Sequence, residues 1–374
     1  MMFRKLMGSS PVIRAFAIIL VVVGAALPFL AESFTLMRFS YVLQMALAVL
    51  SLNLLTGLAG QINLGQAAFV GLGAYTVVIL NTTYSLTVLT ASIIAIAVTA
   101  GVGLIIGLPS LRLRGLYVTL TSLGLAIIFP VVIQASREHT GGTAGMALAT
   151  PVTAPAWTGF DDTQWVYLVS FVITTVCCVL VRNLKNSRMG RALQASRDHE
   201  TVGQAFGIRP STIKLTTIGI SSALAGLSGC LFAMQRQFVS PGDFTLLRAI
   251  DYFVGMALGG STSILGAVFG GGFLEFAPRW ISDAGFAPVL SPLLYAVILW
   301  LVVIFLPGGV SGACRTLIDR MTGLFAARSE AAGAPINPGE STPKITTAIA
   351  KKRPEDSDIP APVLDSDDDK TRSI

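Results

Sequence analysis

The chain contains long stretches in which no charged residue interrupts the hydrophobic pattern. Asp, Glu, Lys and Arg are absent from residues 39–111, 163–181, 215–235, 252–274 and 284–314. A charge at the centre of a membrane helix costs roughly 2.5–3.5 kcal/mol, and about 20 apolar residues cross a bilayer. Each stretch therefore indicates at least one membrane span. A soluble bundle of buried helices would need polar faces at helical spacing, and these stretches have none.

This pattern predicts an all-α polytopic membrane protein with eight to ten transmembrane helices. The provisional spans are 11–30, 39–56, 62–80, 86–108, 115–134, 164–181, 215–235 and 288–306. Broken or re-entrant segments are expected near 57–63 and 259–264, where glycine and polar residues interrupt the apolar pattern. Region 251–281 is either a re-entrant hairpin or two short spans, and irregular backbone at this depth is typical of a pathway.

Charge adds the direction in which the chain crosses the membrane. Only 12% of the residues are charged, against about 25% in a soluble domain, and the net charge is +6. If the N-terminus lies inside, 21 of the 26 Lys and Arg residues fall on the cytoplasmic side. This is the positive-inside pattern, so we expect cytoplasmic N- and C-termini and no nucleic-acid partner.

Three regions are expected along the chain. Residues 1–38 form a cytoplasmic N-tail and the first transmembrane helix, although this segment could instead be a cleaved signal peptide. Residues 39–307 form the membrane core, with an external loop at 135–163 and a basic internal loop at 182–214. Residues 308–374 form a cytoplasmic tail, largely disordered after about 326 because its Pro, Ser, Thr and Asp content leaves little to bury.

The internal loop has the pattern of one or two short amphipathic helices. Apolar residues recur close to i, i+3, i+4 spacing between Met189 and Phe206, with charged residues elsewhere on the helix. Such a helix either docks on a cytoplasmic partner or lies on the inner leaflet, and composition leaves both open.

The spans carry few side chains suited to catalysis or ion coupling. They offer no nucleophile with a base and no paired acids, so we predict no catalytic residues. His139 and His199 fall on opposite sides of the membrane, which argues against a metal site. The same lack of charge disfavours proton coupling, although a sodium-coupled carrier that uses carbonyls and hydroxyls stays open.

Uncharged polar groups and glycines gather instead between residues 53 and 75. Glycine allows close helix packing, whereas buried amides need hydrogen-bonding partners. Helix packing explains most of the glycines but not four amides so close together. Our candidates for the pathway or the helix breaks are Asn53, Gly57, Gly60, Gln61, Asn63, Gly65, Gln66, Gly259 and Gly260.

The 53–75 segment resembles the signature of the branched-chain amino-acid permease family of bacterial ABC importers, and specifically its LivM-type members. The resemblance continues through residues 111–117, 140–142, 190–200 and 205–208, Lys214, and the glycines at 259–260, 266 and 270. These motifs follow the family's order and cover roughly residues 40–307.

The resemblance implies a transmembrane permease subunit of an ATP-driven importer in the bacterial inner membrane, for branched-chain or related amino acids. Its partners would be a homologous permease subunit, two cytoplasmic ATPase subunits and a periplasmic solute-binding protein. ATP and Mg would bind the ATPase, because this chain contains no phosphate-binding loop motif and should hold no cofactor. The residues that match the family's ATPase-coupling loop are Arg191, Arg197, Asp198, Glu200, Ala205, Gly207, Ile208 and Lys214.

Three alternatives stay open from the sequence. An ABC permease of this kind could carry urea, amides or small organic acids rather than amino acids. A self-sufficient secondary transporter or channel would work without an ATPase. A membrane anchor would use the internal loop to recruit a soluble partner.

Overall fold

The computed structural model describes residues 11–111, 116–198 and 209–283, together with residues 290, 293–297, 309–310 and 312. The chain divides into two compact units, Met1–Arg320 and Met321–Ile374, and every described residue belongs to the first. The regular elements among its described residues are helices and two short strands. The elements in chain order are α1 (Pro11–Leu30), α2 (Ser33–Leu52), η2 (Asn53–Leu58), α3 (Gln66–Tyr84), α4 (Val88–Ser110), α5 (Leu116–Ala135), α6 (Arg137–Thr140), η3 (Gly142–Ala144), β1 (Met146–Ala147), α7 (Asp162–Asn186), α8 (Arg188–Asp198), α10 (Pro210–Arg236), β2 (Phe238–Val239), η4 (Pro241–Phe244), α11 (Leu246–Gly259) and α12 (Ile264–Asp283).

Six helices among the described residues are long and apolar enough to cross a membrane, which confirms the all-α polytopic prediction. They are Ser33–Leu58, Gln66–Tyr84, Val88–Ser110, Tyr117–Ala135, Asp162–Asn186 and Pro210–Arg236. Each coincides with a predicted span, and α1 has the bounds predicted for the first one. Most of the predicted span 288–306, the predicted tail and both termini lie outside the described residues.

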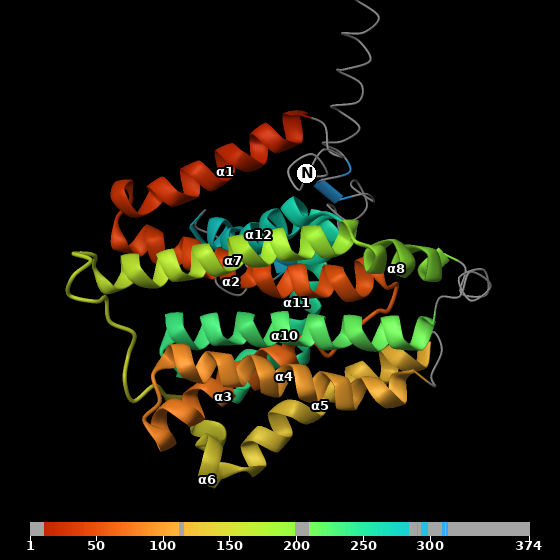
Figure 1. Cartoon of the computed structure of the whole chain (residues 1–374). Coiled ribbons are helices and arrows are strands. Elements are labelled where there is room, and N and C mark those ends of the chain that lie inside the picture. The colour runs from red at the N-terminus through yellow and green to blue at the C-terminus, as the bar shows by residue number, and fades with distance from the viewer. Residues whose placement is uncertain are drawn as a thin grey trace, which may run out of the picture. The chain divides into compact units, whose positions relative to one another are not determined.

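Helices α2 and α10 form the centre of the bundle. Figure 1 shows α7, α2, α10 and α4 lying side by side, and α10 packs against α2, α3 and α4 while α2 packs against α7 and α12. In the most apolar stretch of each span, 83% is buried in the α2 span and in α10, but only 11% in α5. Helix α5 therefore leaves most of its surface for lipid or a partner. A Cβ at Gly73 would overlap the backbone of Gly226, so α3 and α10 touch through their main chains.

Two helices extend further than the charge pattern predicts. Helix α2 begins at Ser33 rather than at residue 39, with the Arg38 guanidinium 4.3 Å from the Phe34 ring centroid. Helix α7 continues past residue 181 to Asn186 and includes Lys185. Long basic side chains are tolerated at the ends of membrane helices because their apolar stems pack along the helix while the charge reaches a polar environment.

Both predicted breaks are present, and they lie at the same end of the bundle. The last turn of the α2 span is π-helical (η2), and residues 59–65 are irregular before α3 begins. Helix α11 ends at Gly259, and residues 260–263 turn the chain into α12. We call this end, defined by residues 53–65 and 260–263, the break end.

The opposite end is covered by residues 137–161 and 237–245, which we call the cap end. Strands β1 and β2 pair antiparallel there, with Met146 opposite Val239. Asn81, at the end of α3, bonds to this cover: its Oδ1 accepts from the backbone N–H groups of Ala149 and Thr150 at 3.0 and 3.1 Å. The predicted external loop thus has a defined structure with side-chain links to the bundle.

Candidate functional site: the contact between two helix breaks

The two breaks touch each other across 210 residues of sequence. Asn53 in η2 donates from Nδ2 to the backbone oxygen of Ser263 at 3.0 Å. One turn later, a Cβ at Gly57 would overlap the backbone oxygen of Ser261, so only glycine allows this approach. The predicted break residues Gly259 and Gly260 flank the other side of the contact, and Gly260 has φ +99° at the end of α11.

The first break supplies its own hydrogen bonds. The hydroxyl of Thr56 donates to the backbone oxygen of Gln61 at 2.9 Å, and the Gln61 N–H donates to Leu55 at 3.2 Å. Gly60, with φ +70°, reverses the chain between them. Irregular backbone at this depth has to be satisfied inside the protein, and these bonds do so.

Three of the four clustered amides link parts of the protein to one another. The Asn63 Oδ1 accepts from Gly65 N–H at 2.8 Å, and its Nδ2 donates to Gln66 Oε1 at 3.3 Å. Gln66 in turn donates to the Ser51 hydroxyl, which joins the start of α3 to the end of α2. Together with the Asn53 bond, these contacts explain the amide cluster as the internal bonding of the break.

Two basic side chains reach the break end from the α7–α8 segment. Arg197 of α8 donates from Nη1 to the backbone oxygen of Gly57, and its stem packs on Gly60. Lys185, at the end of α7, donates from Nζ to the backbone oxygen of Thr262 at 2.5 Å. Gly57 lies near the end of η2, where carbonyls lack helical partners and stabilise a cation, whereas Thr262 lies in the turn between α11 and α12. Each break therefore has one cation on a backbone carbonyl.

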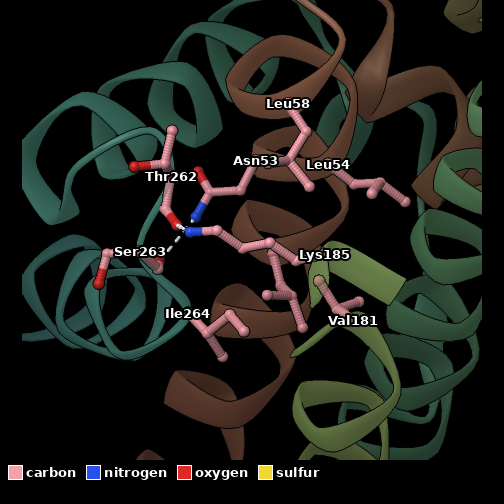
Figure 2. A pocket seen from close by; sticks show the side chains of 9 residues that line it. Asn53, Leu54, Leu58, Val181, Lys185, Thr262, Ser263 and Ile264 are labelled. Carbon is pink, nitrogen blue, oxygen red and sulfur yellow. Dashed lines mark hydrogen bonds between the residues drawn. The ribbon is translucent and has the colours of Figure 1, made fainter. Parts of the chain in front are cut away.

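The contact between the breaks is closed. Figure 2 shows the nitrogen atoms of Asn53 and Lys185 directed at the 262–263 turn, with the apolar side chains of η2 and α7 around them. The cavity here has a volume of about 10 Å³, on the order of a single water molecule. It is lined by Leu50, Asn53, Leu54, Leu58, Val181, Lys185, Thr262, Ser263 and Ile264. No solute could pass between the two breaks in this conformation.

The predicted coupling residues occupy several positions. Arg191 in α8 donates to the backbone oxygen of Asn186 at 3.0 Å, within its own segment. Lys214 lies in the first turns of α10, and Asp198 is the last residue of α8. Residues 199–208 lie outside the described residues, and they include the predicted coupling residues Glu200, Ala205, Gly207 and Ile208.

Lys185 and the carbonyls of residues 261–263 belong to the site, although the sequence pattern does not single them out. The pattern places Lys185 in the predicted internal loop 182–214, because a charge is expected to end a span. Backbone oxygens leave no mark in a residue pattern, so the acceptors could not be identified from the sequence. The available signal was a lysine one turn beyond an apolar span, which is typical of a helix end that extends to the membrane surface.

A family described as "Branched-chain amino acid transport system / permease component" matches residues 34–306. The matched region includes both helix breaks, α8 and the cap end. It thus covers all the elements that build the site.

Individual relatives agree with this match. The high-affinity branched-chain amino acid transport system permease protein LivM of Escherichia coli is 29% identical over 87% of this chain and 80% of its own length. BraD of Pseudomonas aeruginosa, a permease protein of the same kind of system, is 27% identical over 71% of this chain and 91% of its own. The autoinducer 2 import system permease protein LsrC of Salmonella typhi is 26% identical over 53% of this chain and 56% of its own. No solved structure gives a significant match.

Proposed function

Because the chain belongs to the branched-chain amino acid transport system permease family, we propose that it is the transmembrane subunit of an ATP-driven importer for branched-chain or related amino acids. The observation that carries this proposal is the family match over residues 34–306, which includes the break contact and α8. The confirmed polytopic helical fold is consistent with it.

The proposed mechanism is alternating access, driven by ATP hydrolysis on partner subunits. The segment from α8 to the start of α10 would contact the ATPase at the cytoplasmic face. Movement of α8 would act directly on the break end, because Arg197 of α8 is hydrogen-bonded to the backbone oxygen of Gly57. Opening and closing of the break contact would then control access to the pathway from the inner side.

The assembly would contain a homologous permease subunit, two ATPase subunits and a periplasmic solute-binding protein, in the inner membrane of a bacterium. ATP and Mg would bind the ATPase subunits. The chain has no G-x-x-x-x-G-K-[ST] motif, which supports placing nucleotide chemistry on a partner.

Branched-chain or related amino acids are the proposed solutes because the relatives named above include two permeases of branched-chain amino acid systems. The charge-free stretches support a neutral or zwitterionic cargo. Urea, amides and small organic acids are the competing cargoes, and most of the selection would rest with the binding protein.

The test is uptake into proteoliposomes that contain the complete importer. We expect radiolabelled leucine, isoleucine or valine to accumulate only when both ATP and the binding protein are supplied. Unlabelled amino acids, urea, amides and small organic acids, added as competitors, identify the cargo class. A protonophore or sodium ionophore should leave uptake unchanged.

The coupling region provides the matched variants. Substituting Glu200 or Gly207 should abolish ATPase association and uptake while membrane insertion stays normal. Uptake that survives these changes would contradict the coupling role. Accumulation by this chain alone, without an ATPase, would replace the proposal with a secondary transporter.

A further inference from the structure

The α7–α8 segment contacts both breaks with positive charge, although the breaks come from opposite halves of the sequence. Lys185 reaches the 260–263 turn and Arg197 reaches η2. These two cations are separated by only twelve positions in the chain. One short segment therefore holds two helix ends that are otherwise far apart in sequence.

The two cations are mechanically connected through a tight turn. The side chain of Ser187 caps it, accepting from Gly190 N–H at 3.3 Å. A Cβ at Gly190 would overlap the backbone oxygen of Lys185, so α8 starts in close contact with the last turn of α7. Leu193 of α8 is buried, which fixes the helix against the bundle. A displacement of α8 must therefore act on Lys185 as well as on Arg197.

Each cation donates to one backbone carbonyl of a break. The carbonyl of Gly57 lies near the end of η2, where the helical hydrogen-bond pattern stops, and the carbonyl of Thr262 lies in the turn between α11 and α12. A hydrogen bond to a charged donor is about twice as strong as one between neutral groups. The breaks themselves share one side-chain bond, from Asn53 to Ser263, and the close contact at Gly57.

We propose that Lys185 and Arg197 form a two-cation latch that holds the two helix breaks together, and that displacement of α8 withdraws both cations at once. The latch rests on the proposed function, which supplies the force that moves α8. In the resting importer the latch keeps the inner end closed. When the ATPase moves α8, both backbone carbonyls lose their cations in one step and the breaks separate.

The experiment measures the distance between the breaks directly in the assembled importer. Spin labels are placed on Ile62→Cys and Thr262→Cys, two exposed positions of the break end, in a chain whose native cysteines are replaced by alanine. Pulsed electron resonance then reports the distance distribution in nanodiscs without nucleotide. We expect a single short distance in the parent.

Removing the cations should lengthen that distance. Lys185→Met and Arg197→Met each keep an unbranched stem and lose the charge, so each should raise the separated population by roughly tenfold. The double variant should be mostly separated. Arg197→Lys, which restores a cation, should return the distribution toward that of the parent.

Arg188→Ala is the matched control, because it removes a positive charge from the first residue of α8, an exposed position with no bond to either break. It should leave the distance unchanged. A parent-like distance in the double variant would overturn the latch, and so would equal separation in Arg188→Ala.

The latch and the proposed function fail in different ways. If ATPase subunits do not co-purify with the parent chain, the proposed function fails whatever the distances show. If they co-purify and the double variant stays closed, only the latch fails. A variant that aggregates is replaced by Arg197→Gln, which keeps a neutral donor and should give an intermediate separated population.

Discussion

The two ends of the bundle are held together by different kinds of contact. At the cap end, polar side chains, paired strands and edge-to-face aromatic rings join neighbouring elements. At the break end, the three side-chain bonds from Asn53, Lys185 and Arg197 converge on backbone carbonyls of the two breaks. The cap end thus depends on complementary side chains and paired strands, whereas the two breaks are joined by side chains that bond to main-chain oxygens.

This difference separates a permanent junction from a releasable one. Side-chain networks and strand pairing are lost only when the groups that form them are pulled apart one by one. Lys185 and Arg197 each make one bond to a backbone carbonyl, and water can take the place of the cation on that carbonyl once α8 has moved. The break end is therefore the end better suited to open and close during transport.

The largest effect is expected from Gly57→Ala. The new Cβ would overlap the Ser261 oxygen, and backbone on both sides would have to move. Overpacking of this kind costs about 1–3 kcal/mol, and here it also separates the breaks. We expect uptake to be lost and the apparent melting temperature in detergent to fall.

Gly101→Ala provides the comparison, since nothing lies within 4 Å of a Cβ at that position of α4. Alanine is also the better helix former, so stability should stay the same or rise slightly. Equal losses of uptake and of melting temperature in Gly57→Ala and Gly101→Ala would show that the close contact at Gly57 is not required.

A smaller effect is expected at the cap end from Asn81→Ala. Its amide donates to Leu86 O at 2.8 Å and to the Thr150 hydroxyl at 2.6 Å, in addition to the two bonds that it accepts. Leaving these buried groups without partners should cost about 2–3 kcal/mol. Thermal unfolding should report the loss.

Transport should survive Asn81→Ala at temperatures where the protein remains folded, because the cap end is not the part that opens. The neighbouring change Thr82→Ala removes one exposed hydrogen bond of 3.3 Å to the Ala147 oxygen. It should leave both transport and the melting temperature almost unchanged. Loss of transport in folded Asn81→Ala would contradict the proposal that only the break end opens and closes during transport.

The smallest effect is expected from Tyr75→Phe. The Tyr75 ring packs against Phe129 and Phe244, but its buried hydroxyl has no hydrogen-bond partner among the described residues. Removing an unpaired buried hydroxyl should leave stability unchanged or raise it by up to about 1 kcal/mol. Tyr167→Phe should instead destabilise by about 1 kcal/mol, since that hydroxyl donates to Gly24 O at 2.8 Å. Melting temperatures of the two variants show whether the Tyr75 hydroxyl contributes to stability as the Tyr167 hydroxyl does.

The sequence predicts the centres of the helices well and their ends poorly. Absence of charge is a strong condition for the middle of a bilayer, so the six described spans all coincide with charge-free stretches. The condition relaxes near the surface, where Arg38 and Lys185 continue their helices. Because charges are tolerated near the membrane surface, the charge of Lys185 does not mark the end of α7, and the predicted site therefore omits this residue.

Both breaks were predicted, but their contact was not. Gly57 and Gly260 are recognisable as positions where a helix can end. The contact of Gly57 with Ser261 depends on the packing of α2 against α12, which one sequence cannot reveal. The roles of the predicted pathway and coupling residues stay predictions, and the variants above test the part that reaches the break end.

The π-helix η2 makes the length of this segment critical. Its i→i+5 bonding accommodates one more residue per turn than an α-helix, and Gly57 lies inside it. The π turn already absorbs this extra residue, so a further residue inserted upstream of Gly57 would rotate Gly57 by about 100° away from Ser261. Insertions should therefore be selected against here, even though the segment borders an irregular loop where changes in length are usually harmless.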